Sequence, residues 1–529
     1  MIRRKLLLTK SLILLCLFTT TMRLPGIQPT VTAEVLHSAD EKTDALLATR
    51  WLWKSYMSAD QTTVNIENPD RYILQFNADG SLNITADCNR VIAGYKFTVP
   101  NISITPGPAT LAACPPGSKG DLFVDLLGRA DQIFVRGMML IVILKDKGTL
   151  TFSAPTLVDR CGKNAVSINA LDNGLDPATT DQLDKVLVGF VESGTRPAPG
   201  ASLLVITPAG RYFKSVGVAD ISTCEPLKAD SNYQIGSNTK MMTSSIIYQL
   251  QESGRLRTSD RLSRWLPDLA ARLPGGNEIT IEMLLTHTSG LSDYFEIETE
   301  GGKISSGTQN RKMLTRAFTP FELVELVAAD GKQLFKPGEK GKWAYSNTGY
   351  ILLGLIIEKA TGRSYEENLR ERIFKPLGLK TAYLQRGGPV AGSLPQSYYM
   401  PPFTFSTRDW NASQGWSAGA VVMTSTDFSV FLKALFTGKL FRSKRTLDLM
   451  LGIPAAGIGV LGVGTKYGHG MLENKGVLGH GGETLGFQSD GGYIPGKDVT
   501  IVMWANSAQN NVNRLTVPII AGIVTGERK

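Results

Sequence analysis

The stretch Tyr233-Gln-Ile-Gly-Ser-Asn-Thr-Lys240 decides the fold and the chemistry of the larger part of this chain. Ser237 and Lys240 open a predicted helix with an apolar face, which ends at Gly254. Residues three apart share a helix face, so the Lys240 amine can reach the Ser237 hydroxyl. Serine is a poor nucleophile until a neighbour takes its proton, and a buried lysine with a lowered pKa can do so. The spacing predicts an activated serine, although Ser237 could by itself be only a helix cap.

Two further motifs lie downstream of this stretch. Tyr345-Ser-Asn347 stands on a loop before an apolar helix predicted over 349–359. His480-Gly-Gly482 and Glu483 precede a strand-rich stretch, and small residues in an edge strand let a substrate approach the backbone. The three elements in this order are far less expected by accident than any one of them alone. The sequence therefore predicts a single site built from all three.

The two ends of this region predict its architecture. A helix is predicted over 181–191, followed by a hairpin whose strands are 201–206 and 211–218. Near the other end, 499–504 is typical of a strand and 512–524 of an apolar helix. A helix and strands at one end, with strands and a helix at the other, imply a mixed sheet closed by both ends of the domain.

These motifs resemble those of the class C β-lactamase and D-alanyl-D-alanine carboxypeptidase family, which also contains esterases and D-amino-acid peptidases. Two more runs carry the resemblance, Leu284-Leu-Thr-His-Thr-Ser-Gly-Leu291 and Trp416-Ser-Ala-Gly-Ala-Val-Val-Met-Thr-Ser-Thr-Asp427. The resemblance spans about 181–524. It implies an α+β or α/β fold of the β-lactamase/transpeptidase type, an antiparallel sheet flanked by helices with a helical subdomain. We expect this domain over 178–529.

The resemblance also implies roles for the site residues. Ser237 would be acylated, and Lys240 and Tyr345 would share general acid–base duty. Asn347 would bind the substrate's amide. His480 stands where members of the family place a Lys or His that contacts a substrate carboxylate.

Gly482 and Glu483 complete the expected substrate-binding residues, and the backbone N–H groups of Ser237 and Glu483 would form the oxyanion hole. Class C β-lactamases typically show Lys-Thr-Gly where this chain has His480-Gly-Gly482, so the pattern looks more like the carboxypeptidase, peptidase and esterase branches. The expectation is an exported serine hydrolase that acts through an acyl-enzyme on an ester, amide or D-amino-acid peptide bond. The alternative is a catalytically slow or inert penicillin-recognising receptor for cell-wall peptides.

Histidine chemistry of other kinds is disfavoured. The four histidines, His37, His287, His469 and His480, form no His-x-x-x-His pair, and no Gly-x-Ser-x-Gly elbow occurs. We therefore expect no metal and no organic cofactor. We expect His287 to be structural and to shape a loop near the pocket, and His480 could also hydrogen-bond within the scaffold instead of touching substrate.

A smaller β-rich unit is predicted over 45–155. Two hairpins are predicted. The first pairs a strand at 71–76 with one at 81–86, and the second pairs a strand at 138–144 with one at 149–153. Four runs resemble the META domain of bacterial envelope proteins: Trp51-Leu-Trp53, Phe76-Asn-Ala-Asp-Gly80, Ala86-Asp-Cys-Asn-Arg90 and Ala112-Ala-Cys-Pro115. Residues 156–177 hold Pro, Gly, Asn and Asp without a sustained period, which indicates a linker.

The cysteines allow several states. Cys16 lies in the N-terminal segment, and Cys88, Cys114, Cys161 and Cys224 show no CxxC spacing. These four could form disulfides in an oxidising compartment, with three pairings if all are used, or stay buried free thiols. Because two of the META-like runs each hold a cysteine, that resemblance favours Cys88 with Cys114.

The N-terminal segment predicts export. Residues 1–33 carry five basic and no acidic side chains, and 11–22 are almost wholly apolar before a small-residue site at Val31-Thr32-Ala33. We expect a periplasmic or secreted protein, with an uncleaved membrane anchor as the alternative. Removing the segment lowers the formal charge from +9 to +4, so the charge indicates no nucleic-acid partner. The expected partners are a small-molecule or cell-wall peptide substrate and, through the N-terminal domain, the envelope.

Overall fold

The computed structural model describes most of the chain beyond its N-terminal segment. The described ranges are 46–47, 49–98, 100–136, 138–192, 197–305, 311–388, 394–399, 406–461, 464–508 and 516–526. The predicted export signal over 1–33 lies outside them. Within these ranges, no helix combines the length and the apolar character needed to cross a membrane.

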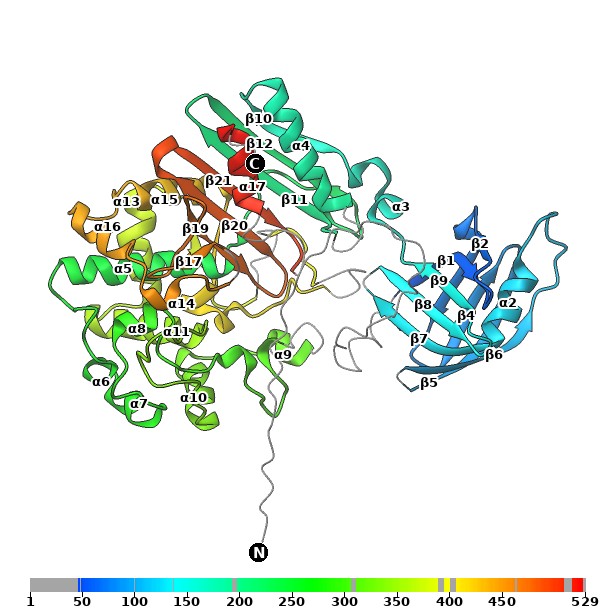
Figure 1. Cartoon of the computed structure of the whole chain (residues 1–529), viewed down its shortest axis with the longest axis horizontal. Helices are drawn as coiled ribbons and strands as arrows, with labels where there is room; N and C mark the ends of the chain where they lie inside the picture. Colours follow the sequence, from blue (N-terminus) through cyan, green and yellow to red (C-terminus); the bar gives the residue numbers. More distant parts are fainter. Residues whose placement is uncertain are drawn as a thin grey trace, which may run out of the picture. The chain divides into compact units, whose positions relative to one another are not determined.

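Residues 50–153 form a nine-stranded antiparallel sheet that closes on itself, because β1 pairs with β9 as well as with β3 (Figure 1). The strands alternate buried and exposed side chains, as β4 does with buried Leu82 and Ile84, so one face of the sheet encloses a core. The helix α2 (Gly120–Gly128) adds Phe123, whose ring stacks on Trp53 with centroids 4.7 Å apart. The strands are β1 (Arg50–Met57), β2 (Thr63–Asn65), β3 (Tyr72–Phe76), β4 (Ser81–Ala86), β5 (Asn89–Thr98), β6 (Asn101–Ala109), β7 (Ala130–Arg136), β8 (Met139–Leu144) and β9 (Thr149–Ser153).

Both predicted hairpins of this unit are confirmed. β3 pairs with β4 and β8 pairs with β9, each in antiparallel register. The first turn ends at Gly80, whose φ of +83° is a conformation that glycine adopts without steric cost. The side chain of Asp79 accepts a 2.9 Å hydrogen bond from the backbone N–H of Ser81, which closes the turn locally.

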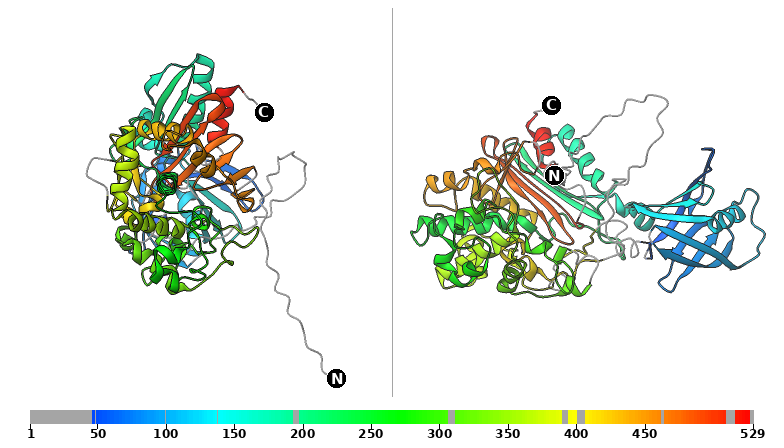
Figure 2. Two further views of the ribbon diagram at one scale, coloured as in Figure 1. Left: turned by 90° about the vertical axis from the view of Figure 1, so that its left-hand side faces the viewer. Right: turned by 60° about the horizontal axis from the view of Figure 1, so that its bottom comes forward.

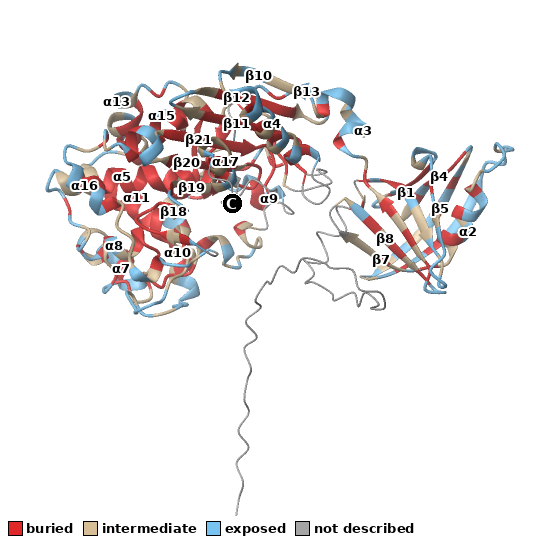
Figure 3. Ribbon diagram, turned by 45° about the horizontal axis from the view of Figure 1, so that its top comes forward, coloured by how far each residue is buried: buried red, intermediate tan, exposed pale blue. Residues whose placement is uncertain are grey.

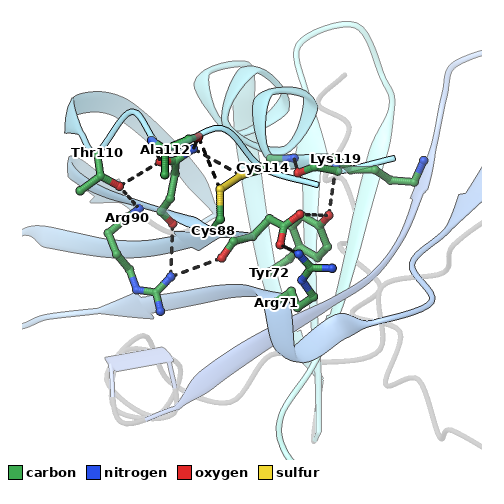
Figure 4. The surroundings of a disulfide bond; sticks show 12 residues. Arg71, Tyr72, Cys88, Arg90, Thr110, Ala112, Cys114 and Lys119 are labelled. Carbon is green, nitrogen blue, oxygen red and sulfur yellow. Dashed lines mark hydrogen bonds and ion pairs between the residues drawn. A yellow bond between two sulfur atoms is a disulfide. The ribbon is translucent and has the colours of Figure 1, made fainter. Parts of the chain in front are cut away.

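The structure joins Cys88 to Cys114 by a disulfide, the pair that the META resemblance favoured (Figure 4). Cys88 lies in the turn between β4 and β5, and Cys114 lies in the segment after β6. The Asn89 side chain ties the same two segments together, since its Nδ2 donates to the Ala112 carbonyl at 3.1 Å and its Oδ1 accepts from the Ala112 N–H at 2.8 Å. The exposed segment after β6 is therefore fixed to the sheet by one covalent and several polar links.

The residues predicted as a linker, 156–177, instead form α3 (Leu157–Cys161), a 3₁₀ turn and β10 (Ile168–Asn173). β10 pairs antiparallel with β12 (Gly210–Asp220) and is the edge strand of the second sheet. A second disulfide joins Cys161 to Cys224. The linker interpretation was wrong because the β10 sequence Ile-Asn-Ala-Leu-Asp-Asn breaks apolar–polar alternation at Ala170-Leu171, and none of its residues is buried.

The second sheet is antiparallel at every pairing and is not mixed as predicted from its ends. Its order is β10-β12-β11-β21-β20-β19-β18-β17, so strands from the two ends of the domain meet at its centre, where Ala201 of β11 pairs with Ala505 of β21. The prediction that both ends close the sheet is confirmed. The remaining strands are β11 (Gly200–Thr207), β17 (Thr465–Tyr467), β18 (Leu472–Asn474), β19 (Val477–Glu483), β20 (Gln488–Ile494) and β21 (Val499–Ala505), with β13 (Glu225–Pro226) beside β12.

Helices cover both faces of this sheet (Figures 1 and 2). α4 (Pro177–Glu192) and α17 (Thr516–Thr525) pack on one face, with Leu183, Leu187 and Ile520 in a shared core. On the other face lie α15 (Ser425–Phe436) and the helical region, in which α5 (Thr239–Glu252) and α11 (Asn347–Thr361) are mostly buried (Figure 3).

Shorter elements complete the helical region. A three-stranded sheet has the order β14 (Tyr233–Gln234), β16 (Val421–Met423) and β15 (Tyr383–Leu384). It directs the chain from β14 into the turn that precedes α5. The other helices are α6 (Leu262–Trp265), α7 (Pro267–Arg272), α8 (Ile281–Leu285), α9 (Arg311–Thr315), α10 (Pro320–Asp330), α12 (Tyr365–Leu369), α13 (Lys375–Leu377), α14 (Trp416–Gly419) and α16 (Lys444–Met450).

Replacing Cys161 and Cys224 by serine should lower the free energy of unfolding by about 4 kcal/mol, because their disulfide closes a loop of 63 residues in the unfolded chain. Differential scanning calorimetry of the variant with both Cys161→Ser and Cys224→Ser, compared with the parent, measures this loss. The matched variant Cys88→Ser with Cys114→Ser opens a loop of 26 residues and should lose less. Equal melting curves for the parent and the Cys161/Cys224 variant would contradict the prediction.

Candidate active site

Ser237 lies in the 3₁₀ turn η3 (Gly236–Asn238), directly before α5. Gly236 has φ +54°, and a Cβ placed on it would lie 2.6 Å from the backbone nitrogen of Glu483. A Cβ on Gly482 would overlap the carbonyl oxygen of Ile235. The two glycines therefore let the end of β19 approach the backbone of the serine turn, as expected for a strand beside a reacting centre.

Lys240 follows one turn later and is fully buried. Its Nζ lies 2.9 Å from Ser237 Oγ, 2.7 Å from Asn347 Oδ1 and 2.9 Å from the carbonyl oxygen of Ala418. Burial lowers the pKa of Lys240 to about 7, against the opposing charge of Asp293. The amide and carbonyl oxygens can only accept hydrogen bonds, so a neutral amine gives them its two N–H groups and turns its lone pair to the Ser237 hydroxyl.

Tyr345 approaches Ser237 from another element. Its hydroxyl lies 2.9 Å from Ser237 Oγ, and its ring centroid lies 4.9 Å from Lys240 Nζ. Tyr345 lies two residues before the first residue of α11, and the loop before this helix therefore carries it to the serine. Two groups capable of taking or returning the proton of Ser237 thus contact the same oxygen.

Asn347 is the first residue of α11 and is held by a carboxylate that sequence reasoning missed. Its Nδ2 and its backbone N–H both donate to Asp293 Oδ2, at 2.8 and 3.2 Å. These bonds turn its Oδ1 toward Lys240. Burial raises the pKa of Asp293, while N–H groups of Phe295 and Asn347 lower it. Asp293 lies two residues beyond the 284–291 run, and nothing in its spacing marks it.

His480 is buried within β19, and both its ring nitrogens contact protein groups. Nε2 lies 3.1 Å from the Tyr467 hydroxyl, and Nδ1 contacts the Gly481 carbonyl oxygen. Of the two interpretations of His480, this geometry matches the scaffold hydrogen bond. Glu483 ends the same strand and is exposed, with its backbone nitrogen beside the serine turn.

His287 lies close behind the site. Its Nδ1 accepts from the Ser346 N–H at 3.2 Å, and its ring centroid is 4.4 Å from that of Tyr345. Burial holds the pKa of His287 well below its usual value, and a positive charge on Lys240 or His480 would lower it further. The expectation that His287 shapes a loop next to the site is consistent with these contacts.

No metal-binding arrangement accompanies these residues. Across the described ranges, no three or more His, Cys, Asp or Glu side chains gather as ligands of one ion.

A cavity of about 780 Å³ lies away from the site and is lined by residues that include Gln249, Glu252, Arg372 and Lys433. The structure therefore brings Lys240 and Tyr345 to Ser237 and Asn347 to Lys240, with Gly482 and Glu483 at the adjoining strand.

Known proteins resemble this chain in sequence and in fold. Penicillin-binding protein 4* of Bacillus subtilis is 36% identical over 169 residues, which are 32% of this chain and 34% of that protein. Penicillin-binding protein PbpX of the same species is 28% identical over 291 residues, 53% of this chain and 63% of that protein. The chain thus spans less than two thirds of the length of either relative. Among solved structures, the D-stereospecific amidohydrolase of a Streptomyces species is 27% identical with a TM-score of 0.57, covering 66% of this chain and 99% of that one.

Two family models match the chain. The model described as META domain matches 44–156, the region of the closed sheet. The model described as Beta-lactamase matches 183–521, which includes Ser237, Lys240, Tyr345 and His480. Since this second match takes in more than half of the residues, the chain belongs to the β-lactamase family and carries a META domain ahead of that fold.

Proposed function

We propose that the chain is a serine hydrolase that forms an acyl-enzyme on Ser237 and cleaves amide or ester bonds. The observation that carries the proposal is the pair of 2.9 Å contacts at Ser237 Oγ, one from Lys240 Nζ and one from the Tyr345 hydroxyl. An amine with a pKa near 7 is partly neutral at physiological pH, so it can accept the serine proton. A receptor without turnover has no need of such a base.

The reaction then follows from the positions of these groups. Ser237 Oγ attacks the substrate carbonyl carbon as its proton passes to Lys240, and the backbone N–H groups of Ser237 and Glu483 stabilise the oxyanion. The bond to the leaving nitrogen or oxygen breaks as that atom receives a proton from Lys240 or Tyr345. Water attacks the acyl ester in the second half, gives a proton to the same pair, and Ser237 Oγ recovers its own.

The strand β19 favours substrates without a free carboxylate beside the scissile bond. His480 is buried, Gly481 and Gly482 have no side chain, and Glu483 is an anion. A carboxypeptidase must bind a terminal carboxylate, and β19 supplies no side-chain cation for one. The likeness to a D-stereospecific amidohydrolase agrees with an amide substrate, and we extend the proposal to amides or esters of small or D-configured acyl groups.

Export belongs to the proposal as well. The two disulfides of the described chain support an oxidising compartment, in agreement with the apolar segment near the N-terminus. Periplasmic or secreted enzymes of this kind meet cell-wall peptides, and we propose these as one source of substrate. Envelope association would then fall to the META domain.

A fluorophosphonate should label the protein at Ser237, because the probe reacts with activated serines. Intact-mass spectrometry should show one adduct in the parent and none in Ser237→Ala. Ser245→Ala is the matched control, since Ser245 lies on α5, directly after the turn that holds Ser237, and its hydroxyl donates to the Met241 carbonyl at 2.7 Å, away from Ser237. An unlabelled parent that is folded by circular dichroism would contradict the proposal and support the receptor alternative.

The acid limb of the pH profile of kcat/KM should report Lys240. Activity should fall below about pH 7, because the protonated amine cannot accept the Ser237 proton. The charge of Asp293 raises this pKa, so Asp293→Asn should move the limb to lower pH.

Steady-state hydrolysis of a nitrophenyl ester over pH 4.5–9, a range of about two units on either side of neutrality, measures the limb. Asp260→Asn is the control, since Asp260 is also a buried carboxylate and bonds to Arg264 and Trp265 outside the site. A limb that stays in place or moves to higher pH in Asp293→Asn would refute the assignment to Lys240.

A further inference from the structure

A continuous chain of hydrogen bonds runs behind the site through three buried side chains. The backbone N–H of Ser346 donates to His287 Nδ1 at 3.2 Å, and His287 Nε2 lies 3.0 Å from the Tyr467 hydroxyl. The Tyr467 hydroxyl lies 3.1 Å from His480 Nε2, and His480 Nδ1 contacts the carbonyl oxygen of Gly481. We call this series, from Ser346 to Gly481, the imidazole–tyrosine chain.

With both imidazoles neutral, the chemistry of the two ends fixes the direction of every bond. The Ser346 N–H can only donate, so Nδ1 of His287 accepts and its Nε2 carries the proton. Tyr467 then accepts from His287 and donates its own O–H to Nε2 of His480. The Nδ1–H of His480 is left to donate to Gly481, which can only accept. Both imidazoles are neutral in this arrangement, and burial next to Lys240 favours the neutral form of His287.

The ends of the chain lie at the two halves of the catalytic apparatus. Ser346 stands between Tyr345 and Asn347, which contact Ser237 and Lys240. Gly481 stands two residues before Glu483, whose backbone nitrogen adjoins the serine turn. The connection therefore joins the loop that carries the proton-transfer groups to the strand that carries an oxyanion donor.

Two observations argue against simple packing. The Tyr467 hydroxyl is buried, and a buried hydroxyl is unfavourable unless its hydrogen bonds are made, so phenylalanine would serve better if only the ring mattered. His287 also holds φ at +59°, in the left-handed region that residues with a Cβ seldom occupy. A residue held in this conformation and bonded at both ring nitrogens is fixed in place by its surroundings.

We infer that His287, Tyr467 and His480 are positioning residues that set the separation between the Tyr345 hydroxyl and the oxyanion N–H of Glu483. None of the three needs to touch the substrate. The inference rests on the proposed hydrolase function and adds to it a group of residues that act through others. A shift of about an ångström in the loop that carries Tyr345, or in the end of β19 that carries Glu483, is enough to slow the chemical step while ground-state binding is retained.

Tyr467→Phe in the full-length protein tests the inference, because it removes one oxygen and breaks both central bonds. With a nitrophenyl ester, kcat should fall by about tenfold to a hundredfold while KM changes by less than about threefold. A boronic acid forms a tetrahedral adduct at the serine, and that adduct needs the Tyr345 hydroxyl and the Glu483 N–H correctly placed at the same time. The affinity of the variant for a boronic acid should therefore fall by a similar factor.

Tyr248→Phe is the matched control. Tyr248 is also buried, and its ring meets His469 edge-on with centroids 5.7 Å apart, against 5.6 Å for Tyr467 and His480. Its hydroxyl bonds to the Leu449 carbonyl, outside the site. This variant should retain the kcat and the boronic acid affinity of the parent.

A double-mutant cycle separates positioning from loss of structure. His287→Gln breaks the chain next to Ser346. The double variant with Tyr467→Phe should lose no more activity than the worse single variant, because both act on one connection. Either single variant carries the test if the other does not fold. Fully additive losses, or a Tyr467→Phe variant that matches Tyr248→Phe in kcat and boronic acid affinity, would overturn the inference. A parent protein that takes no fluorophosphonate would instead refute the proposed function.

Discussion

The burial of one amine is the constraint on which the larger domain's site depends. Lys240 is inaccessible to solvent, and a polar group without water must find partners within the protein. Its partners come from three separate elements: the serine turn, the start of α11 and α14. The start of α11 and α14 each lie more than a hundred residues beyond Lys240 in sequence, so satisfying one amine fixes the relative positions of much of the helical region.

The approach of the sheet to this amine depends on backbone contact. β19 reaches the serine turn only because Gly236 and Gly482 have no Cβ at the junction. The sheet itself is held by the pairing of β11 with β21, which come from the two ends of the domain. A strand from the last part of the chain therefore delivers its N–H groups to a helix formed near the middle. The proposed oxyanion donor at Glu483 and the proposed nucleophile Ser237 are brought together by topology, since they are far apart in sequence.

The contacts of Asp293 determine how the side chain of Asn347 is oriented in the site. An asparagine amide can be turned either way, and only the carboxylate at its Nδ2 sets its Oδ1 against Lys240. The imidazole–tyrosine chain acts in the same manner on a larger scale, because its fixed donor at Ser346 and fixed acceptor at Gly481 leave one consistent arrangement for two neutral imidazoles. The need of buried donors and acceptors to form hydrogen bonds thus determines which atoms face Ser237.

Features that depend on residues close together along the chain could be predicted from the sequence. Helical spacing predicted that Lys240 lies on the same side as Ser237, and alternation predicted the hairpins of the META domain. The sequence motifs indicated the family and the pairing of Cys88 with Cys114. Tertiary structure alone decided that β10 belongs to the second sheet, that His480 is buried, and that Asp293, Ala418 and Tyr467 support the site. The physical reason is that these features are contacts between segments distant in sequence, made through single polar atoms or backbone pairing. No local hydrophobic period or residue spacing encodes them, so they exist only once the chain has folded.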